Sequence, residues 1–316
     1  MIKKIVIVSP LPIYGGSLVM FKLCKLLEEK KIDARIYLYD KLRSPRTTSL
    51  LKKAIYDIAN ITLNSLYNLK NQIRLLLERM HLISIAYQPI KCKYQLIPFF
   101  SKDTVVLYPD VIYGNPLHAK KVVRWLLSHN RFGNDPNAYG KEDLFFCFRE
   151  LFNDYNLNPT CRTLVINYFD NELYKQMNFG PREGVCYIIR KGKNRVDLPK
   201  FFWGPIIDEL SEKEKVAVLN RCKYCYFYDT QTFYTSIACV CGCIPIIMME
   251  HGKKKTDYMG KGDYDYGKAF GDTPEEIEYA IKTRSERLKL LDYDKENEKN
   301  VNFFINEIEK YFKNNF

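Results

Sequence analysis

Apolar and polar positions along the chain follow two alternating periods, which predicts strands separated by helices. Residues 4–8 (KIVIV) form a short continuous apolar run, typical of a strand that is buried on both faces. Residues 17–31 then carry apolar side chains at helical spacing, and residues 32–39 (IDARIYLY) return to a strand pattern. This strand–helix–strand segment, with Gly15 and Gly16 in its turn, is long enough for a right-handed parallel crossover.

A long helical segment and further elements follow in the first half. Residues 50–87 predict a packed pair of helices with a basic, solvated face, and the same pattern also fits an amphipathic surface that rests on an anionic bilayer. Strands are predicted at residues 104–108 (TVVLY) and 143–148, and a helix at residues 119–128. The inward-facing residues of that helix would be Val122, Val123, Leu126 and Leu127.

A second α/β pattern begins after a polar, irregular stretch, so we place a domain junction between Asn153 and Gly184. The elements expected after it are strands at residues 185–190, 224–228 and 244–249, and helices at residues 210–220, 232–241, 274–291 and 300–312. The predicted architecture is therefore two parallel α/β domains. In such sheets ligands lie at the carboxyl ends of the strands.

Composition and charge narrow the class of protein. The chain has 316 residues, of which 47% are hydrophobic and 27% charged, enough apolar material for two cores. No apolar stretch reaches the roughly 18 residues of a membrane span, and the apolar run near the N-terminus is too short for a signal peptide, so we expect a cytoplasmic protein. The net charge of +12 favours anionic partners such as nucleotides, nucleic acid or a membrane surface.

Basic and hydroxyl side chains gather in the loops after predicted strands. The loop RKGKNR, which begins at Arg190, could bind a diphosphate, since arginine offers a planar fork and lysine a point charge. The segment YDTQTFYTS could present an aspartate and several hydroxyls to phosphate oxygens or a ribose. Its candidate residues are Asp229, Thr230, Thr232, Thr235 and Ser236. A solvated loop and an ordinary helix cap are the plainer interpretations of these two segments.

Metal binding is the alternative chemistry. The chain has ten cysteines, and Cys222, Cys225, Cys239, Cys241 and Cys243 could suggest zinc, but their apolar neighbours favour buried thiols that fill a core. Asp263 and Asp265 form a DxD pair, as do Asp292 and Asp294, and such a pair could hold Mg²⁺ or Mn²⁺ on a diphosphate.

The order of these motifs resembles GT-B-fold glycosyltransferases of the bacterial surface-polysaccharide type. The resemblance lies in the glycine pair, "RKGK" after a strand, "YDTQTFYTSIACVCGCIPII", and "VVLYPDVIYGNPLHAKKVVRWLLSHN". It implies two Rossmann-like domains that face a cleft: residues 1–165 on the acceptor side, with a helical insert at about 41–95, and residues 180–298 on the nucleotide-sugar side. Residues 299–316 would form a C-terminal helix that could pack back on the first domain.

The resemblance also implies roles for particular residues. The donor-binding residues would be Gly15, Gly16, Arg190, Lys191, Lys193, Asp229, Thr230, Thr232, Thr235 and Ser236. The acceptor-side residues would be Asn115, His118 and His129, with Asp110 as the catalytic base and Asp135 as a further candidate. Many such enzymes carry a glutamate for the ribose where this chain has Ile237, so ribose binding would fall to Asp229.

The reaction implied by the resemblance is transfer of a sugar from a nucleoside diphosphate sugar to a hydroxyl of a glycan or lipid-linked acceptor in cell-surface polysaccharide (capsule) synthesis. The nucleotide sugar would be a substrate, with no metal and no cofactor, and the enzyme could sit peripherally at the inner face of the membrane. A metal-dependent DxD-type transferase and a non-catalytic nucleic-acid-binding protein are the alternatives.

Overall fold

The computed structural model describes residues 2–11, 15–40, 50–83, 90–98, 100–230, 232–259 and 264–315. The chain divides into two compact units. Unit 1 comprises Met1–Tyr168 together with Asp294–Phe316, and unit 2 comprises Phe169–Tyr293. Each unit is an α/β structure built on a parallel sheet. No helix in the described part of the chain is long and apolar enough to cross a membrane.

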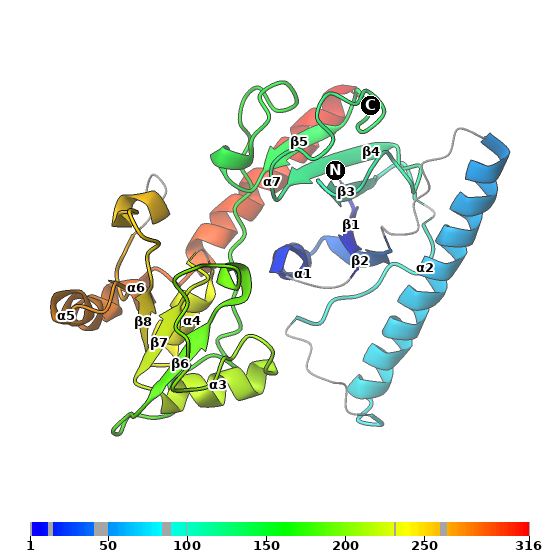
Figure 1. The fold of residues 1–316 in the computed structure, drawn as a ribbon. Helices are drawn as coiled ribbons and strands as arrows, with labels where there is room; N and C mark the ends of the chain where they lie inside the picture. Colours follow the sequence, from blue (N-terminus) through cyan, green and yellow to red (C-terminus); the bar gives the residue numbers. More distant parts are fainter. Residues whose placement is uncertain are drawn as a thin grey trace. The chain divides into compact units, whose positions relative to one another are not determined.

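Unit 1 is built on a five-stranded sheet with the strand order β2-β1-β3-β4-β5. The strands are β1 (Lys4–Pro10), β2 (Asp33–Tyr39), β3 (Thr104–Pro109), β4 (Lys121–Leu126) and β5 (Leu144–Cys147), and the helices are α1 (Gly15–Glu29), α2 (Leu50–Arg79), the 3-10 turn η2 (Glu150–Phe152) and α7 (Asp294–Asn315). One face of the sheet packs against α1 and α7 (Figure 1). Strands buried on both faces explain the continuous apolar runs in the sequence.

The helix predicted at residues 119–128 is wrong, because these residues form β4. Lys121 pairs with Val105 and Trp125 with Pro109, in parallel register with β3. Apolar residues at 122, 123, 125 and 126 satisfy a buried strand as well as a helix, and periodicity alone does not separate the two in so short a run. The connection from β3 to β4 therefore contains no described helix.

The predicted helix pair at residues 50–87 is a single described helix, α2, which runs beside the edge strand β2. Asn68, which is fully buried, accepts a hydrogen bond from the backbone N–H of Leu38 at 2.9 Å and donates one to its carbonyl at 3.0 Å. One turn earlier, Asn64 accepts from the N–H of Asp40 at 3.1 Å. Asparagine side chains thus take the place of the next strand and satisfy the edge of the sheet.

Helix α7 belongs to unit 1, although unit 2 precedes it in the sequence. Val301, Phe304 and Ile308 are fully buried in the core that also contains α1 and β1. At the start of the helix, Asn297 exchanges hydrogen bonds with the backbone N–H and carbonyl of Asn167. The chain therefore leaves unit 1 after Tyr168 and returns to it at Asp294.

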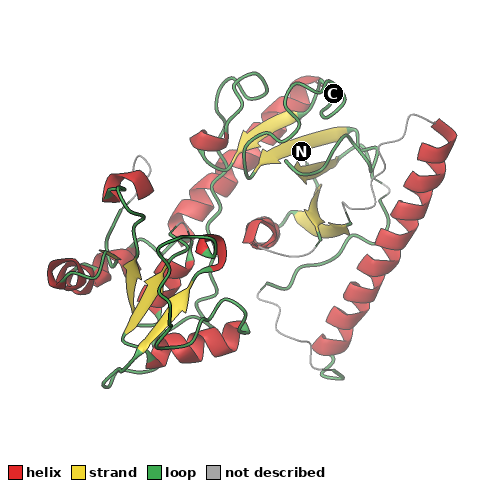
Figure 2. Cartoon of the chain, in the orientation of Figure 1, coloured by secondary structure: helices red, strands yellow, loops and turns green. Residues whose placement is uncertain are grey.

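Unit 2 is built on a four-stranded parallel sheet with the order β6-β7-β8-β9. Figure 2 shows strands in yellow and helices in red. The strands are β6 (Val185–Ile188), β7 (Tyr224–Phe227), β8 (Ile244–Ile247) and β9 (Ala269–Phe270), with the helices α3 (Glu212–Arg221), α4 (Tyr234–Val240), α5 (Pro274–Lys282) and α6 (Arg284–Lys289) and the 3-10 turns η3 (Arg190–Gly192) and η4 (Lys255–Tyr258). The single helix predicted at residues 274–291 is divided into α5 and α6 at Thr283, whose hydroxyl accepts a hydrogen bond from the N–H of Gly267.

We expect Asn68→Ala to lower the free energy of unfolding of unit 1 by about 2–3 kcal/mol, because it leaves the N–H and carbonyl of Leu38 buried without partners. Urea unfolding followed by Trp125 fluorescence, in a Trp203→Phe background, reports on unit 1 because Trp125 is fully buried there. The control is Asn71→Ala, which removes an exposed bond to the carbonyl of Tyr67 and should cost less than about 0.5 kcal/mol. Equal effects of the two changes would contradict the edge-capping role.

Candidate functional site

The carboxyl edge of the unit 2 sheet carries a cavity of about 430 Å³. Parallel pairing places the ends of β6, β7 and β8 side by side, so the loops that follow these strands meet there. The lining residues include Lys191, Gly192, Arg195, Asp229, Thr230 and Lys253, together with Glu250 and Tyr258. We call this space the unit 2 cavity.

Asp229 is the most unusual residue of the cavity. Its side chain is 2% exposed, and neither carboxylate oxygen forms a hydrogen bond with a described residue. Its backbone N–H bonds to the carbonyl of Ile188 at 3.2 Å, which fixes the residue between the ends of β7 and β6. Buried polar groups in native proteins nearly always have partners, so the unsatisfied carboxylate makes Asp229 a candidate ligand-binding residue.

Two exposed cations face this carboxylate. Arg190 Nε lies 4.0 Å from one oxygen of Asp229, and Lys191 Nζ lies 4.0 Å from the other. These distances are too long for hydrogen bonds, and solvent screens the attraction because both cations are largely exposed. The side chains of Arg190 and Lys191 are 64% and 60% exposed, respectively. Lys191 lines the cavity, whereas Arg190 is not one of its lining residues.

Gly192 allows the basic loop to approach β7. A Cβ atom on this residue would lie 2.2 Å from the carbonyl oxygen of Tyr228, closer than any side chain tolerates. Glycine at this position therefore lets the η3 turn lie directly against the end of β7, which brings Arg190 and Lys191 over Asp229.

The other basic residues of the RKGKNR loop have different surroundings. Arg195 donates to the Asp197 carboxylate through Nε at 2.8 Å and to the carbonyl of Met248 at 2.6 Å, so it braces the cavity wall. The Asp197 carboxylate in turn raises the pKa of Arg195. Lys193 is exposed, and the structure does not bring it into the cavity. Lys253 of the cavity lining was missed by sequence analysis, because its loop carries no motif.

The predicted hydroxyl cluster is separated by the fold. Thr230 lines the cavity. Thr235 is buried and donates its hydroxyl to the carbonyl of Thr232 at 3.1 Å, and the hydroxyl of Ser236 accepts a hydrogen bond from Arg287 inside the unit. The structure therefore places Thr235 and Ser236 in the packing of α4 rather than at the cavity.

Asp110 lies at the carboxyl edge of the unit 1 sheet, after β3. It is 2% exposed, and its oxygens accept hydrogen bonds from the backbone N–H of Leu127 at 3.1 Å and from the hydroxyl of Ser128 at 2.5 Å. Burial raises the pKa of the Asp110 carboxyl, although these two bonds and the nearby Arg131 oppose the shift. With both oxygens engaged, Asp110 joins the ends of β3 and β4.

Gly16, near the start of α1, lies close to the side chain of Leu127.

Asn115 and His118 lie apart from Asp110, whereas His129 directly follows Ser128, which bonds to Asp110. Asn115 bonds to the Tyr108 hydroxyl and to both backbone groups of Ala119, so its side chain holds its own loop together. His118 lies just before β4, and the first residue of β4 pairs near the start of β3. Asp110 follows the end of β3, so the length of the strand separates the two residues. The ring of His129 packs against Phe152 at 5.3 Å.

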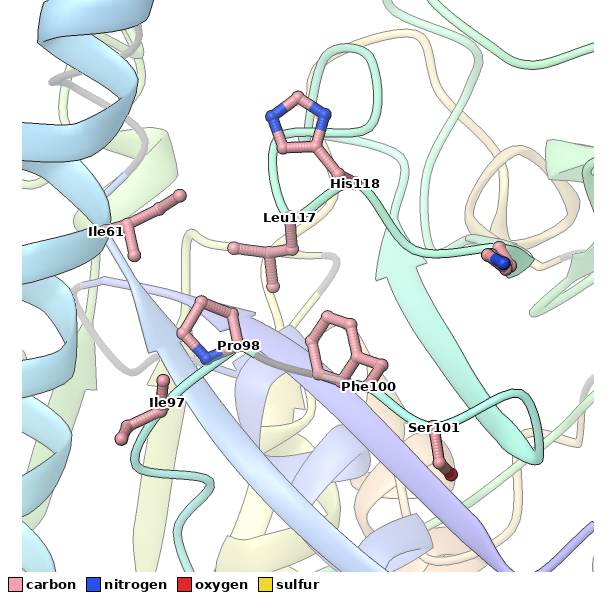
Figure 3. A pocket seen from close by; sticks show the side chains of 8 residues that line it. Ile61, Ile97, Pro98, Phe100, Ser101, Leu117 and His118 are labelled. Atoms are coloured by element: carbon pink, nitrogen blue, oxygen red, sulfur yellow. The ribbon is translucent and has the colours of Figure 1, made fainter.

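His118 instead lines a mainly apolar cavity of about 320 Å³ beneath α2. The side chains of Ile61, Pro98, Phe100 and Leu117 gather around this space (Figure 3). Asp135, the remaining base candidate, accepts a hydrogen bond from the Tyr113 hydroxyl at 3.1 Å. The structure therefore does not assemble the acceptor-side residues into one cluster.

A buried ion pair in unit 1 was also missed by sequence analysis. Arg124, fully buried on β4, bonds to Asp143 at 2.6 Å and to the backbone carbonyls of Ile112 and Gly114. Its guanidinium lies 4.9 Å from the centre of the Tyr108 ring. These contacts hold the helix-free connection between β3 and β4. A sequence signal was present in the charged residue within the apolar run KVVRWL.

The described residues contain no group of three or more His, Cys, Asp or Glu side chains placed to hold a metal ion. Cys225 and Cys243 are buried in the unit 2 core, and burial raises the pKa of both thiols. Asp265 pairs with Lys255 and Tyr279, whose hydrogen bonds outweigh burial and lower its pKa. Its partner Asp263 lies outside the described residues.

The second DxD pair is divided between the units. Asp292 belongs to unit 2, whereas Asp294 belongs to unit 1 and lies 3.8 Å from Lys22. Only Tyr293 separates the two aspartates in the sequence, and the boundary between the units falls after it.

Comparisons with known proteins give no family assignment. No protein-family model matches the chain, and no curated protein matches it. One solved structure, described as a crystal structure analysis of the glycotransferase of kitacinnamycin, aligns with 98% of this chain and 95% of its own, at 9% sequence identity and a TM-score of 0.36. A likeness at that level carries no argument about this chain.

We expect Asp229→Ala to leave unit 2 at least as stable as the natural chain, because it removes a buried carboxylate that makes no hydrogen bond. Hydrogen exchange of peptides from β6, β7 and β8 measures the free energy of opening of this unit. The matched control is Asp208→Ala, which removes a 2.7 Å bond to the N–H of Ile189 and should lower that free energy by about 1–2 kcal/mol. A larger loss from Asp229→Ala than from Asp208→Ala would show that Asp229 is a structural residue.

Proposed function

We propose that the protein is a glycosyltransferase that binds a nucleoside diphosphate sugar in the unit 2 cavity. The observation that carries this proposal is the unbonded carboxylate of Asp229 beneath Arg190 and Lys191 at the carboxyl edge of a parallel sheet. A diphosphate and a ribose together supply what this arrangement lacks, namely an anion for the cations and hydroxyl donors for the carboxylate.

Each residue has a distinct part in the proposed binding. Arg190 and Lys191 would neutralise the diphosphate, including the negative charge that develops as the sugar leaves. As these cations turn toward the phosphates, the oxygens of Asp229 become available to the ribose hydroxyls, the part taken by a glutamate in GT-B-fold enzymes. Lys253 lies on the same cavity and could meet a phosphate oxygen.

In this proposal unit 1 would be the acceptor side of a GT-B-type enzyme that acts in surface-polysaccharide synthesis, with a glycan or lipid-linked acceptor. We assign Asp110 a positioning part rather than the chemical step, because both its oxygens are engaged at the ends of β3 and β4. Gly15 and Gly16 open α1 at the same edge of the sheet, where backbone can approach a ligand closely.

Replacing Arg190 or Lys191 by Ala should weaken nucleotide binding about 10- to 100-fold, the range expected when one charge-assisted contact to a phosphate is lost. Calorimetric titration with UDP, GDP, CDP and dTDP would identify the preferred nucleotide and measure the loss. Lys213→Ala, which removes an exposed charge from α3 of the same unit, is the matched control and should bind as the natural chain does. Unchanged affinity in both Arg190→Ala and Lys191→Ala would refute the assigned site.

Chelation should leave donor binding and donor hydrolysis unchanged, because the proposed site neutralises the diphosphate with side-chain cations. The measurement is release of the nucleoside diphosphate from the matching nucleotide sugar, with and without excess EDTA. A loss of activity that Mg²⁺ or Mn²⁺ restores would favour the metal-dependent alternative instead.

A further inference from the structure

The orientation of α2 is the reverse of that expected for a surface helix. Its inward side is polar, with Asn64 and Asn68 bonded to the edge of β2 and Gln72 accepting a hydrogen bond from the N–H of Tyr94 at 2.9 Å. The spacing of four residues between these side chains keeps them on one face of the helix. Most of the described apolar side chains of α2 are consequently directed away from the sheet, whereas Leu75 is buried and Ile61 lines the cavity beneath the helix.

The outward side of α2 is an exposed apolar stripe. It comprises Ile55 and Ile58 and, about two turns later, Leu66, Leu69, Ile73 and Leu76, which recur at intervals of three or four on the same face. The exposed Thr62 lies between the two groups. The exposed fractions reach 67% at Ile58 and 57% at Leu66. The helix has 30 residues and is therefore about 45 Å long, so the stripe is far larger than the scattered apolar residues of an ordinary surface.

The charges along α2 are arranged for an anionic surface. Lys70 and Arg74 are exposed on one flank of the stripe, where Tyr56 and Tyr67 are also exposed. The acidic residues of the helix are Asp57 and Glu78, and both are turned away from the stripe and half-buried. Glu78 is held by Lys91 at 2.7 Å. Cations and tyrosines beside an apolar stripe fit the headgroup region of a bilayer that contains anionic lipid.

We propose that α2 is a membrane-docking helix, which lies flat on an anionic bilayer with its apolar stripe among the acyl chains. A second copy of the chain is the other candidate occupant. In such a dimer, Lys70 and Arg74 would face the same two cations of the other α2, which has no described exposed carboxylate. Ion pairs between helices need residues of opposite charge. Charge complementarity therefore favours lipid. The proposal does not depend on the transferase assignment, because docking requires no nucleotide.

Flotation of the full chain with lipid vesicles tests this proposal. We expect binding to vesicles of phosphatidylglycerol and phosphatidylcholine in equal amounts, weaker binding to pure phosphatidylcholine, and a decrease as salt is raised. Leu66→Glu combined with Ile73→Glu should lower the partition coefficient at least tenfold. Lys70→Gln and Arg74→Gln should each lower it about fivefold, on anionic vesicles alone.

The matched control places two glutamates on exposed apolar residues outside α2, Leu151→Glu combined with Phe179→Glu, and should bind as the natural chain does. Circular dichroism and Trp125 fluorescence establish that each variant is folded. Vesicle binding that survives Leu66→Glu with Ile73→Glu in a folded variant overturns the proposal. A second result would also overturn the proposal. The natural chain would form a dimer in light scattering and fail to bind vesicles, and Leu66→Glu with Ile73→Glu would dissociate that dimer, because the stripe would then be a contact between copies.

Discussion

Parallel strand pairing is the constraint on which both units depend. Every described strand pair in the two sheets is parallel, so each strand ends at the same edge as its neighbours. The first polar residues after the strands therefore meet at that edge, against a core that is apolar on both sides. Asp110 follows β3 in unit 1 and Asp229 follows β7 in unit 2, and both carboxylates are buried as a consequence. A buried charge in this position needs partners from the protein or from a ligand.

The two carboxylates meet this requirement in different ways. Asp110 receives hydrogen bonds from Leu127 and Ser128 and so becomes part of the joint between two strands. Asp229 receives none from the described residues, and Arg190 and Lys191 stay at 4.0 Å from it. A buried carboxylate that is unsatisfied in the protein alone is typical of binding sites, where stability is given up for function. This difference is why the proposed function rests on unit 2.

Beside the apolar core that α1 and α7 form on the sheet, polar groups hold two further parts of unit 1. Arg124 and Asp143 hold the helix-free connection between β3 and β4, and Asn68 satisfies the backbone of β2. Because α2 uses its polar side for the sheet, its apolar side remains outside. The edge cap and the proposed membrane-docking stripe are thus two consequences of one helix orientation. That orientation follows from hydrogen bonds to a strand edge, which require amide side chains on the inner face.

The sequence by itself determined the α/β class, most of the strands and helices, and the basic loop with Asp229, because continuous apolar runs and strand-end position are local signals. The tertiary structure decided what local signals leave open. Residues 121–126 became a strand because β3 offers an unpaired edge, which periodicity in so short a run does not reveal. Likewise, Ser236 is buried against Arg287, a partner that is distant in sequence and that no local signal reveals. The face that α2 turns toward the sheet also depends on tertiary contacts, because the backbone groups of β2 need hydrogen-bond partners there.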